Sequence, residues 1–301
     1  MSLQPLNITI IGAGEIGQAL AFVLKKQKAR VELWDRDLSR VPNQKNLEEI
    51  VPKADYLFLC VPSQAIRPAV LSIKSLLKKN TGLICLSKGV ELKTNKFMSE
   101  VLTEILPKGQ PFALCGGPML AEELMQGKPG VSVLATKNSA AFKKLVNLFS
   151  GSVVRLETTT DLIGVATSGV LKNIYAMALG FSEGLGWGAN AQAWLTSECL
   201  TEMERITDKF GGKMETVCYT AGLSDLIATG FSPYSKNRAT GVTMAQTGKC
   251  CVGGEGVVSF PAVWQRLGVG AKKYPLLVIL HQILNNQKNV KKIFENYLRQ
   301  G

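Results

Sequence analysis

A glycine-rich hexapeptide near the amino terminus most restricts what this chain can fold into. The hexapeptide GAGEIG occupies residues 12–17, directly after the β-branched run ITII and at the start of the helix-like segment EIGQALAFVLKKQ. At such a junction Gly12 permits the tight turn, Gly14 lets the backbone approach a pyrophosphate, and Gly17 allows close helix–strand packing. The N-terminus of the helix would then hold the anion. The motif in this context predicts a dinucleotide-binding unit.

An acidic residue lies where such units bind the ribose of the dinucleotide. Asp35 ends the second predicted strand, eighteen residues beyond Gly17. An acid at this place bonds the ribose hydroxyls and favours NAD, whereas a nearby arginine accommodates the additional phosphate of NADP. Arg36 is the next residue. Asp35 therefore favours NAD, and Arg36 keeps NADP open.

The pattern of strands and helices changes near residue 157. Before it, apolar runs that end at Gly or Pro alternate with amphipathic patterns such as residues 94–106, and after it long helical patterns take over. The predicted strands are residues 8–12, 31–35, 55–62, 82–89, 112–117, 130–136 and 152–157, and the predicted later helices are residues 161–184, 189–210, 236–248, 257–267 and 275–300. Alternating strands and helices favour a doubly wound, mainly parallel sheet. We expect an α/β Rossmann domain at 1–157 and an all-helical domain at 158–301.

Charge and hydropathy exclude several classes of protein. The net charge is +12, but the lysines are scattered and do not alternate with aromatic residues, which is typical of a solvated surface and not of a nucleic-acid groove. No apolar run approaches the roughly 18 residues that span a membrane, and residues 1–7 lack the features of a secretory signal. We therefore expect a cytoplasmic protein that neither binds nucleic acid nor inserts into membranes.

The cysteines do not indicate a metal site. There are seven, an odd number, and none form a CxxC pair. The adjacent Cys250 and Cys251 have no histidine or further cysteine at ligand spacing. No bound metal is expected.

A lysine within an apolar helical segment is the main catalytic candidate. Lys172 and Asn173 lie inside SGVLKNIYAMALG, residues 168–180. The ammonium group could reach solvent while its stem is buried, or it could face a cleft in which desolvation and neighbouring cations lower its pKa toward neutrality. The single histidine, His281, lies in the apolar run LLVILHQIL and is expected in the core. Because histidine is so scarce, lysine is the natural proton donor for a dinucleotide enzyme.

Two further segments carry candidate ligands. Lys88, in LSKGVE, ends a predicted strand at the sheet edge where ligands of α/β proteins gather. Residues 222–241 contain Asp225, Thr229 and the run SKNR at 235–238. That run at a helix start would offer backbone N–H groups, an amide and two cations to a phosphate, although it also fits an ordinary Ser-capped basic helix.

Together these segments resemble the NAD(P)-dependent glycerol-3-phosphate dehydrogenases of bacterial type. The resemblance runs in order from about residue 8 to 265. Its segments are GAGEIG, VPSQAI, SKGVE, GGPMLAEEL, DLIGVATSGVLKNIYAMALGFSEGLGWGANA, GLSDLIATG, SPYSKNR and GGEGV. It implies reduction of dihydroxyacetone phosphate to sn-glycerol 3-phosphate, which feeds phospholipid synthesis.

The resemblance also implies roles for individual residues. Lys172 would be the general acid/base, with Asp225 and Lys88 completing the catalytic set. The implied cofactor contacts are Gly12, Gly14, Glu15, Ile16, Gly17, Asp35, Arg36, Lys88, Ala121, Lys236 and Glu255. The implied contacts to the phosphate-ester substrate are Lys88, Gly117, Met119, Lys172, Asn173, Asp225, Thr229, Ser235, Lys236 and Asn237.

The chain departs from the family pattern at several of these positions. Met119 replaces a Ser or Thr, and Lys236 replaces an arginine, so that a bidentate fork becomes a point charge for which Arg238 could compensate. Further departures are Ile16 for an aromatic residue, Gln18 for Ser or Thr, and Gln192 and Glu198 for arginines. Two alternatives therefore stay open: a related dehydrogenase for another small acid or phosphate ester, and a dinucleotide-binding regulatory protein that has lost turnover. Long apolar helices in the second domain predict a homodimer.

Overall fold

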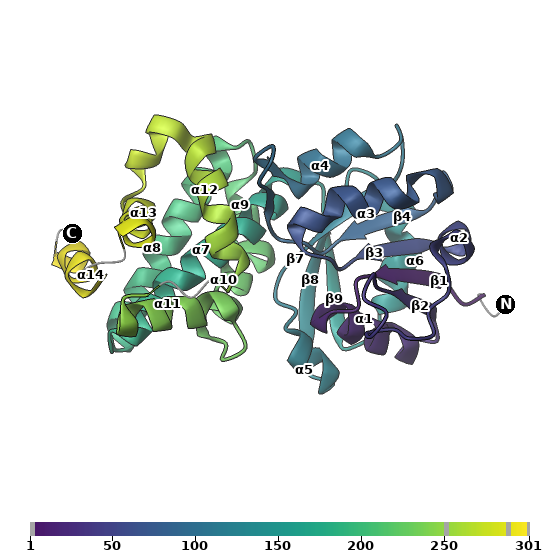
Figure 1. Ribbon diagram of the computed structural model, residues 1–301, viewed down its shortest axis with the longest axis horizontal. Coiled ribbons are helices and arrows are strands. Elements are labelled where there is room, and N and C mark those ends of the chain that lie inside the picture. Colours follow the sequence, from purple (N-terminus) through teal and green to yellow (C-terminus); the bar gives the residue numbers. More distant parts are fainter. Residues whose placement is uncertain (1–3, 250–252, 287–289, 300–301) are drawn as a thin grey trace.

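The computed structural model describes residues 4–249, 253–286 and 290–299. An α/β part built around one sheet packs against a bundle of helices (Figure 1). This arrangement confirms the predicted fold class. The pair Cys250–Cys251, for which no metal site was expected, lies outside the described residues.

The sheet has seven strands in the order β2-β1-β3-β4-β7-β8-β9. Their bounds are β1 Asn7–Ile11, β2 Arg30–Trp34, β3 Tyr56–Leu59, β4 Gly82–Cys85, β7 Phe112–Gly116, β8 Gly130–Ala135 and β9 Val154–Thr159. All pairings are parallel except β7 with β8, so the sheet is mainly parallel, as predicted. The inner strands β3 and β4 are buried throughout and therefore read as continuous apolar runs.

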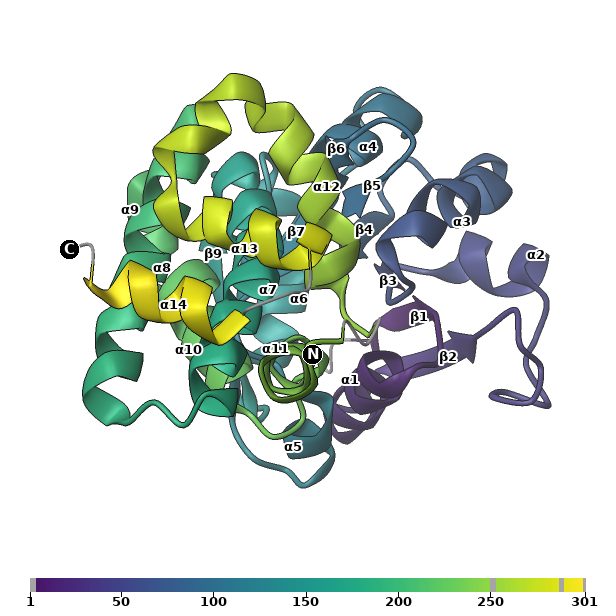
Figure 2. The ribbon, with the colours of Figure 1, turned by 60° about the vertical axis from the view of Figure 1, so that its left-hand side comes forward.

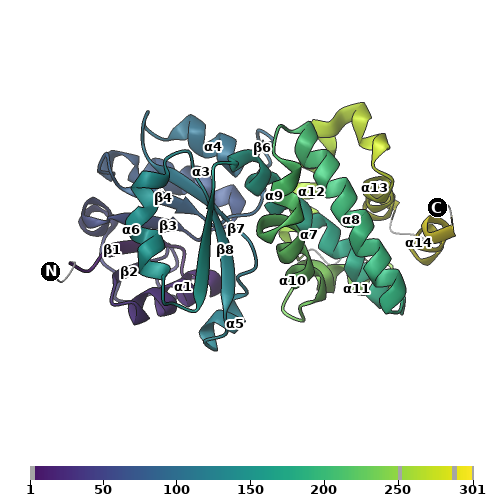
Figure 3. The same ribbon diagram turned by 180° about the vertical axis from the view of Figure 1, so that it is seen from behind.

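Helices cover both faces of the sheet. On one face α1 (Glu15–Lys26), α5 (Ala121–Met125) and α6 (Ser139–Phe149) pack on Ile8, Ile10 and Phe58. On the other face α2 (Leu47–Ile50), α3 (Ile66–Ile73) and α4 (Met98–Ile105) pack on Leu57 and Leu59. Figure 3 shows α6 on the opposite face from α3 and α4. The hydrophobic core on this second face, beneath α2, α3 and α4, continues without interruption into the core of the helical bundle.

A short hairpin interrupts one predicted helix. Within residues 94–106, Lys96–Phe97 form strand β6, which pairs antiparallel with β5 (Val90–Glu91), and α4 begins only at Met98. The prediction of a helix from residue 94 was therefore wrong at its start. Asn95, at φ +56°, adopts a left-handed turn conformation that a helix cannot contain.

The helical bundle is arranged around one central helix, α7 (Leu162–Gly184). The surrounding helices are α8 (Ala189–Lys209), α9 (Met214–Cys218), α10 (Asp225–Phe231), α11 (Lys236–Thr247), α12 (Glu255–Leu267), α13 (Pro275–Asn286) and α14 (Val290–Arg299). Neither α9 nor α10 was predicted. Figure 2 shows α13 and α14 lying across the end of the bundle away from the sheet.

Glycines let α7 and α11 cross with their backbones in contact. A Cβ on Gly180 would lie 2.2 Å from the carbonyl oxygen of Arg238, and one on Gly241 would lie 2.1 Å from that of Met177. This close crossing brings the start of α11 beside the polar residues of α7.

The composition of α7 corrects one expectation. By length and apolar character this helix alone, among the described residues, could cross a membrane, so the statement that no run approaches that length was wrong. However, 94% of its most apolar stretch is buried inside the protein. A helix that is apolar on all sides serves as the core of a bundle when other helices surround it.

Candidate active site

A large cleft lies beyond the carboxyl ends of the parallel strands, where the sheet faces the helical bundle. Its volume is about 1070 Å³. The predicted site residues that line it are Gly12, Gly14, Glu15, Ile16, Asp35, Arg36, Lys88, Met119, Ala121, Lys172, Asn173, Thr229, Ser235, Lys236, Asn237 and Glu255. Gly17, Gly117 and Asp225 lie just behind this surface, where they contact residues that line it. The site is therefore assembled from both parts of the chain.

The glycine turn is tightly packed where it enters α1. Gly12 has φ +103°, and a Cβ there would lie 2.5 Å from the carbonyl oxygen of Cys60. A Cβ on Gly17 would lie 1.9 Å from the carbonyl oxygen of Gly12. Gly14 is the N-cap residue of α1, and it leaves the helix N-terminus open toward the cleft. This is the geometry that holds a pyrophosphate.

Replacing Gly17 by alanine tests the turn. We expect Gly17→Ala to weaken dinucleotide binding at least tenfold and to lower the free energy of unfolding by about 1–3 kcal/mol, because the added methyl group forces α1 away from the turn. Dinucleotide fluorescence titration and urea denaturation measure the two effects. Gly270→Ala is the matched control, since a Cβ there meets no atom within 4 Å. Unchanged binding by Gly17→Ala would show that the dinucleotide does not depend on this turn.

Asp35 is bonded to the glycine turn. Its Oδ2 accepts a hydrogen bond from the Ala13 N–H at 2.7 Å, and its Oδ1 accepts one from the Asp37 N–H at 2.9 Å. Arg40, which the sequence reasoning did not single out, places Nη1 3.8 Å from Asp35 Oδ2 and also lines the cleft. Arg36 is exposed beside them. One carboxylate and two arginines thus lie close together beside the glycine turn. This arrangement is compatible with NAD and with NADP.

Two lysines share one buried carboxylate at the other end of the cleft. Lys172, on α7, is 8% exposed and donates hydrogen bonds to Thr229 Oγ1 at 2.7 Å and to Asp225 Oδ1 at 3.0 Å. Lys88 donates to Asp225 Oδ2 at 2.6 Å and to the carbonyl oxygen of Gly117 at 2.7 Å. Asp225 is 2% exposed. The Lys172 ammonium therefore faces the cleft and does not extend to bulk solvent.

Burial and charge set the protonation of this cluster. Burial lowers the pKa of Lys172 to about 8, the Asp225 carboxylate opposes that shift, and the Lys88 ammonium adds to it. Burial acts to raise the pKa of Asp225, but the Lys172 and Lys88 ammonium groups outweigh it and hold that pKa below its ordinary value. Asp225 is thus charged near neutral pH, and Lys172 titrates close to neutrality, where a general acid is most effective.

Two asparagines join the elements around the lysines. Asn173 donates to the carbonyl oxygen of Lys88 at 3.1 Å, and Asn237 donates to Asn173 Oδ1 at 2.9 Å. The N–H of Gly256, in the first turn of α12, donates to Asn237 Oδ1 at 2.9 Å. Hydrogen bonds therefore connect the loop after β4 with α7, α11 and α12.

The start of α11 has features of both interpretations of the SKNR run, a Ser-capped helix and an anion-binding site. Ser235 caps the helix by accepting from the Arg238 N–H at 3.2 Å, and it lines the cleft together with Lys236 and Asn237. The Arg238 guanidinium, however, forms a two-pronged ion pair with Glu183 of α7 and is not among the residues lining the cleft. The expectation that Arg238 compensates for Lys236 was therefore wrong.

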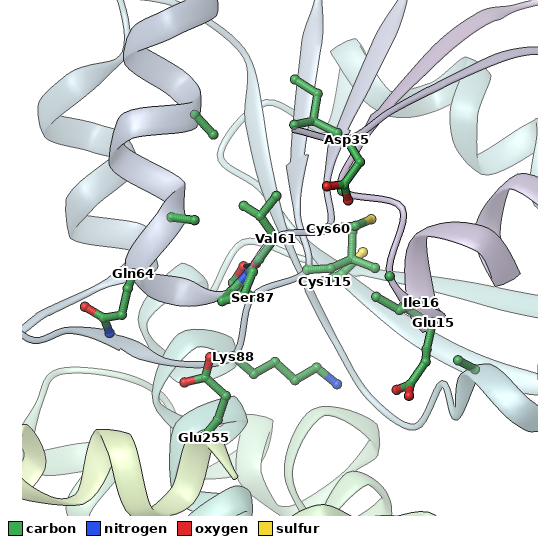
Figure 4. Close-up of a pocket in the computed structure, with 18 of the residues that line it drawn as sticks. Glu15, Ile16, Asp35, Cys60, Val61, Gln64, Ser87, Lys88, Cys115 and Glu255 are labelled. Carbon is green, nitrogen blue, oxygen red and sulfur yellow. Dashed lines mark hydrogen bonds between the residues drawn. The ribbon is translucent and has the colours of Figure 1, made fainter. Parts of the chain in front are cut away.

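Glu255 closes the cleft from α12. Its carboxylate accepts from Ser63 Oγ at 3.1 Å, and burial raises its pKa. Ser63 was not singled out, although it lies in the VPSQAI segment. Figure 4 shows Glu255 and Lys88 at one end of the cleft and Asp35 at the other. His281 lies on α13, half-buried and stacked on Trp264, so it is neither in the cleft nor fully in the core.

The glycine turn at one end and the buried lysine–aspartate cluster at the other define a dinucleotide-dependent oxidoreductase of two-part architecture. Models of the NAD-dependent glycerol-3-phosphate dehydrogenase family match residues 38–142 with their N-terminal part and residues 161–295 with their C-terminal part. The chain belongs to the NAD-dependent glycerol-3-phosphate dehydrogenase family.

Individual relatives agree with this assignment. The glycerol-3-phosphate dehydrogenase [NAD(P)+] of Clostridium botulinum (strain Eklund 17B) is 31% identical over 317 residues, which cover 95% of this chain and 94% of the relative. Glycerol-3-phosphate dehydrogenase [NAD(P)+] 2 of Sphingopyxis alaskensis is 35% identical over 263 residues, covering 80% and 78%. The crystal structure of glycerol-3-phosphate dehydrogenase from Coxiella burnetii superposes with a TM-score of 0.87 at 30% identity and covers 98% of this chain and 99% of that one.

Proposed function

We propose that this protein reduces dihydroxyacetone phosphate to sn-glycerol 3-phosphate with NADH or NADPH, and that Lys172 is the general acid. Membership of the family supports the reaction. The observation that carries the role of Lys172 is its buried ammonium, paired with Asp225 and facing the cleft that contains the glycine turn. In this proposal residues 1–157 bind the dinucleotide and residues 158–301 supply most of the substrate site.

The residues at the glycine turn fit a dinucleotide. Gly12 and Gly17 leave no room for side chains, and Gly14 leaves the α1 N-terminus accessible. These glycines would hold the pyrophosphate, and Asp35 with Arg36 would contact the adenosine ribose. When bound, the nicotinamide supplies the hydride.

The lysine–aspartate cluster would handle the proton and the developing charge. As hydride reaches the carbonyl carbon of the substrate, negative charge grows on the carbonyl oxygen. Lys172 would transfer a proton from Nζ to that oxygen, and the Lys88 ammonium would stabilise the charge before the transfer. Asp225 would hold both cations in place despite their repulsion, and Thr229 would orient Lys172. The neutral Lys172 amine would then recover a proton from water.

The start of α11 would bind the phosphate of the substrate. Backbone N–H groups there, with Ser235, Lys236 and Asn237, offer donors and positive charge to an anion. Lys236 contributes a point charge where an arginine would make two parallel hydrogen bonds, so we expect a weaker hold on phosphate than an arginine would give.

An absorbance assay at the nicotinamide band tests the reaction. We expect oxidation of NADH or NADPH that requires dihydroxyacetone phosphate and is absent with unphosphorylated dihydroxyacetone. A strong preference for an unphosphorylated keto acid would favour a related dehydrogenase. Dinucleotide binding by calorimetry without turnover of any phosphate ester would favour a regulatory protein.

The pH dependence provides a second test. Because burial lowers the pKa of Lys172 to about 8, we expect kcat for reduction to be constant at lower pH and to fall above about pH 8, where the amine has lost its proton. In the oxidation of glycerol 3-phosphate the same amine must accept a proton, so kcat should rise over that range. Both profiles are measured by steady-state kinetics at saturating substrates. Parallel profiles in the two directions would contradict the assigned role.

We also propose that the protein is a cytoplasmic homodimer. The apolar side chains of Ile227, Phe231 and Tyr219 are exposed on the helical part, where a second copy could cover them. Size-exclusion chromatography with light scattering measures the mass in solution, and a mass of one chain at micromolar concentration would contradict the dimer.

A further inference from the structure

Helix α12 lies against the segment that follows Lys88 at its start and is hydrogen-bonded to that segment near its end. At its start, Glu255 bonds Ser63, and a Cβ on Gly89 would lie 2.5 Å from Glu255 Oε2. The chain then continues from Lys88 and Gly89 into the hairpin β5–β6, whose turn lies beside the last residues of α12. There Asn95 Nδ2 donates to Gln265 Oε1 at 2.8 Å. The hairpin thus extends along α12.

Arg266 makes the strongest contact at the far end. It lies on α12, with its side chain 25% exposed, and donates from Nη1 to the carbonyl oxygen of Asn95 at 2.9 Å. Both of its terminal nitrogens also bond the carboxylate of Glu100, in the first turn of α4. Its guanidinium carbon lies 4.5 Å from the ring centre of Phe97. One side chain therefore binds the hairpin turn, its second strand and the helix after it.

The same arginine bridges the two parts of the protein. The Phe210 ring, at the end of α8, contacts the Phe97 ring edge-on at a centroid distance of 5.4 Å. The guanidinium carbon of Arg266 lies 5.1 Å from the centre of the Phe210 ring. Cation–π contacts of this kind stabilise most when they are partly desolvated. Arg266 and Phe210 belong to the helical bundle, and Phe97 belongs to the α/β part.

At its other end α12 lies directly on the helix of Lys172. A Cβ on Gly256 would lie 2.4 Å from the carbonyl oxygen of Asn173. Asn173 is the neighbour of Lys172, and it donates to the carbonyl oxygen of Lys88. Helix α12, which contains Pro261 in its interior, therefore contacts α7 beside Lys172 near one end and the hairpin that continues from Lys88 near the other.

We propose that Arg266 is a positioning residue: by fixing the hairpin 90–97 to α12, it keeps Lys88 Nζ beside Asp225 and so sets its distance from Lys172. The proposal rests on the proposed roles of Lys172 and Lys88. It assigns a catalytic consequence to a contact remote from the reacting atoms. A misplacement of about 1 Å at a catalytic group costs roughly a hundredfold in rate.

The variant Arg266→Ala tests this inference, because a positioning role predicts a change in kcat without a matching change in dinucleotide affinity. We expect kcat for reduction to fall about tenfold to a hundredfold, while the dissociation constant of the reduced dinucleotide, measured by fluorescence, stays within about twofold. Arg266→Lys, which keeps the charge but loses the two-pronged bond, should give an intermediate kcat.

A shift of the pH profile separates positioning from simple loss of folded enzyme. The Lys88 ammonium lowers the pKa of Lys172, so displacement of Lys88 should move the fall in kcat to higher pH. Competitive labelling of the Lys172 amine at a series of pH values, read by mass spectrometry, gives that pKa without relying on activity. If wild-type protein does not turn over dihydroxyacetone phosphate, the proposed function fails, but the labelling comparison still decides the role of Arg266.

Arg67→Ala is the matched control. Arg67, on α3, binds Glu91 of the same hairpin with two hydrogen bonds of 2.7 and 2.9 Å, but both residues belong to the α/β part. We expect Arg67→Ala to lower thermal stability and to leave the pKa of Lys172 unchanged. An unchanged pKa and kcat in Arg266→Ala, or the same pKa shift in both variants, would overturn the proposal.

Discussion

Lys172→Ala is expected to lower kcat for the reduction of dihydroxyacetone phosphate by at least a hundredfold. General acid catalysis contributes typically 10²–10⁴-fold, and in the proposed mechanism Lys88 stabilises the developing charge, whereas Lys172 donates the proton. Thr229 and Asp225 are its hydrogen-bond partners, and neither carries a proton that is acidic enough near neutral pH to replace it. Stopped-flow measurement of a single turnover would isolate the chemical step from product release.

Controls for this variant distinguish chemistry from folding. Asp225 keeps its bond to Lys88 when Lys172 is removed, so we expect the fold and dinucleotide affinity to be retained. Added small alkylamines should restore part of the rate to Lys172→Ala, with an optimum that follows the pKa of the amine. Lys209→Ala, at the end of α8, is the control for losing a lysine from the helical part. A kcat within threefold of the wild-type value would remove Lys172 from the mechanism.

The sequence predicted the elements of the fold better than the contacts between them. The strands of the sheet are local patterns of buried β-branched and aromatic residues, and the glycine turn is a local motif, so both could be recognised from consecutive residues. The hairpin β5–β6 could not, because its two strands have only two residues each. Helix α10 was missed because it has only seven residues, which is too short for a clear helical periodicity, and because it follows directly on a single π-helical turn at Thr220–Ser224.

In the candidate site, too, local sequence patterns were recognised, whereas contacts between residues distant in the chain were not. Lys172 was notable because it stands in an apolar run, but its pairing with Asp225, 53 positions later in the chain, was known only through resemblance. Arg238 was expected in the phosphate site because it follows Asn237, whereas the helix turns its side chain toward Glu183. Arg40 and Ser63 were missed because their contacts with Asp35 and Glu255 depend on the tertiary structure, although Ser63 lies in the VPSQAI segment that contributes to the resemblance.

Asp225→Ala is expected to lower the free energy of unfolding by about 3 kcal/mol near pH 7 and to abolish most activity. Removing one partner of a buried ion pair leaves an uncompensated buried charge, which typically costs about 3–5 kcal/mol. Here two cations lose the same carboxylate, although Lys88 keeps its bond to the carbonyl oxygen of Gly117. Urea denaturation of both proteins measures the difference in stability, and kinetics measures the activity.

The pH dependence of that difference identifies its cause. The pKa of Asp225 is lowered in the folded protein, so the carboxylate stabilises the fold above its ordinary pKa of 3.8, and this stabilisation is lost as the pH falls through the lowered pKa. Without the carboxylate, the pKa of Lys172 should fall below about 8, because the Asp225 charge opposes the effect of burial. A lysine whose pKa is lowered on folding destabilises the fold while it is protonated, and the fold gains stability as the pH rises from that pKa toward the unfolded value.

The deficit of Asp225→Ala should therefore be largest at a pH below the lowered pKa of its Lys172, and it should narrow as the pH rises from that pKa to about 8, above which the wild-type lysine loses its proton as well. Asp225→Asn, which preserves the shape of the side chain, should show the same narrowing with a smaller cavity contribution. A deficit that stays constant over this range in both variants would mean that lost packing, and not an uncompensated cation, destabilises the protein. In that case the buried carboxylate would not be what holds Lys172 charged beside the substrate.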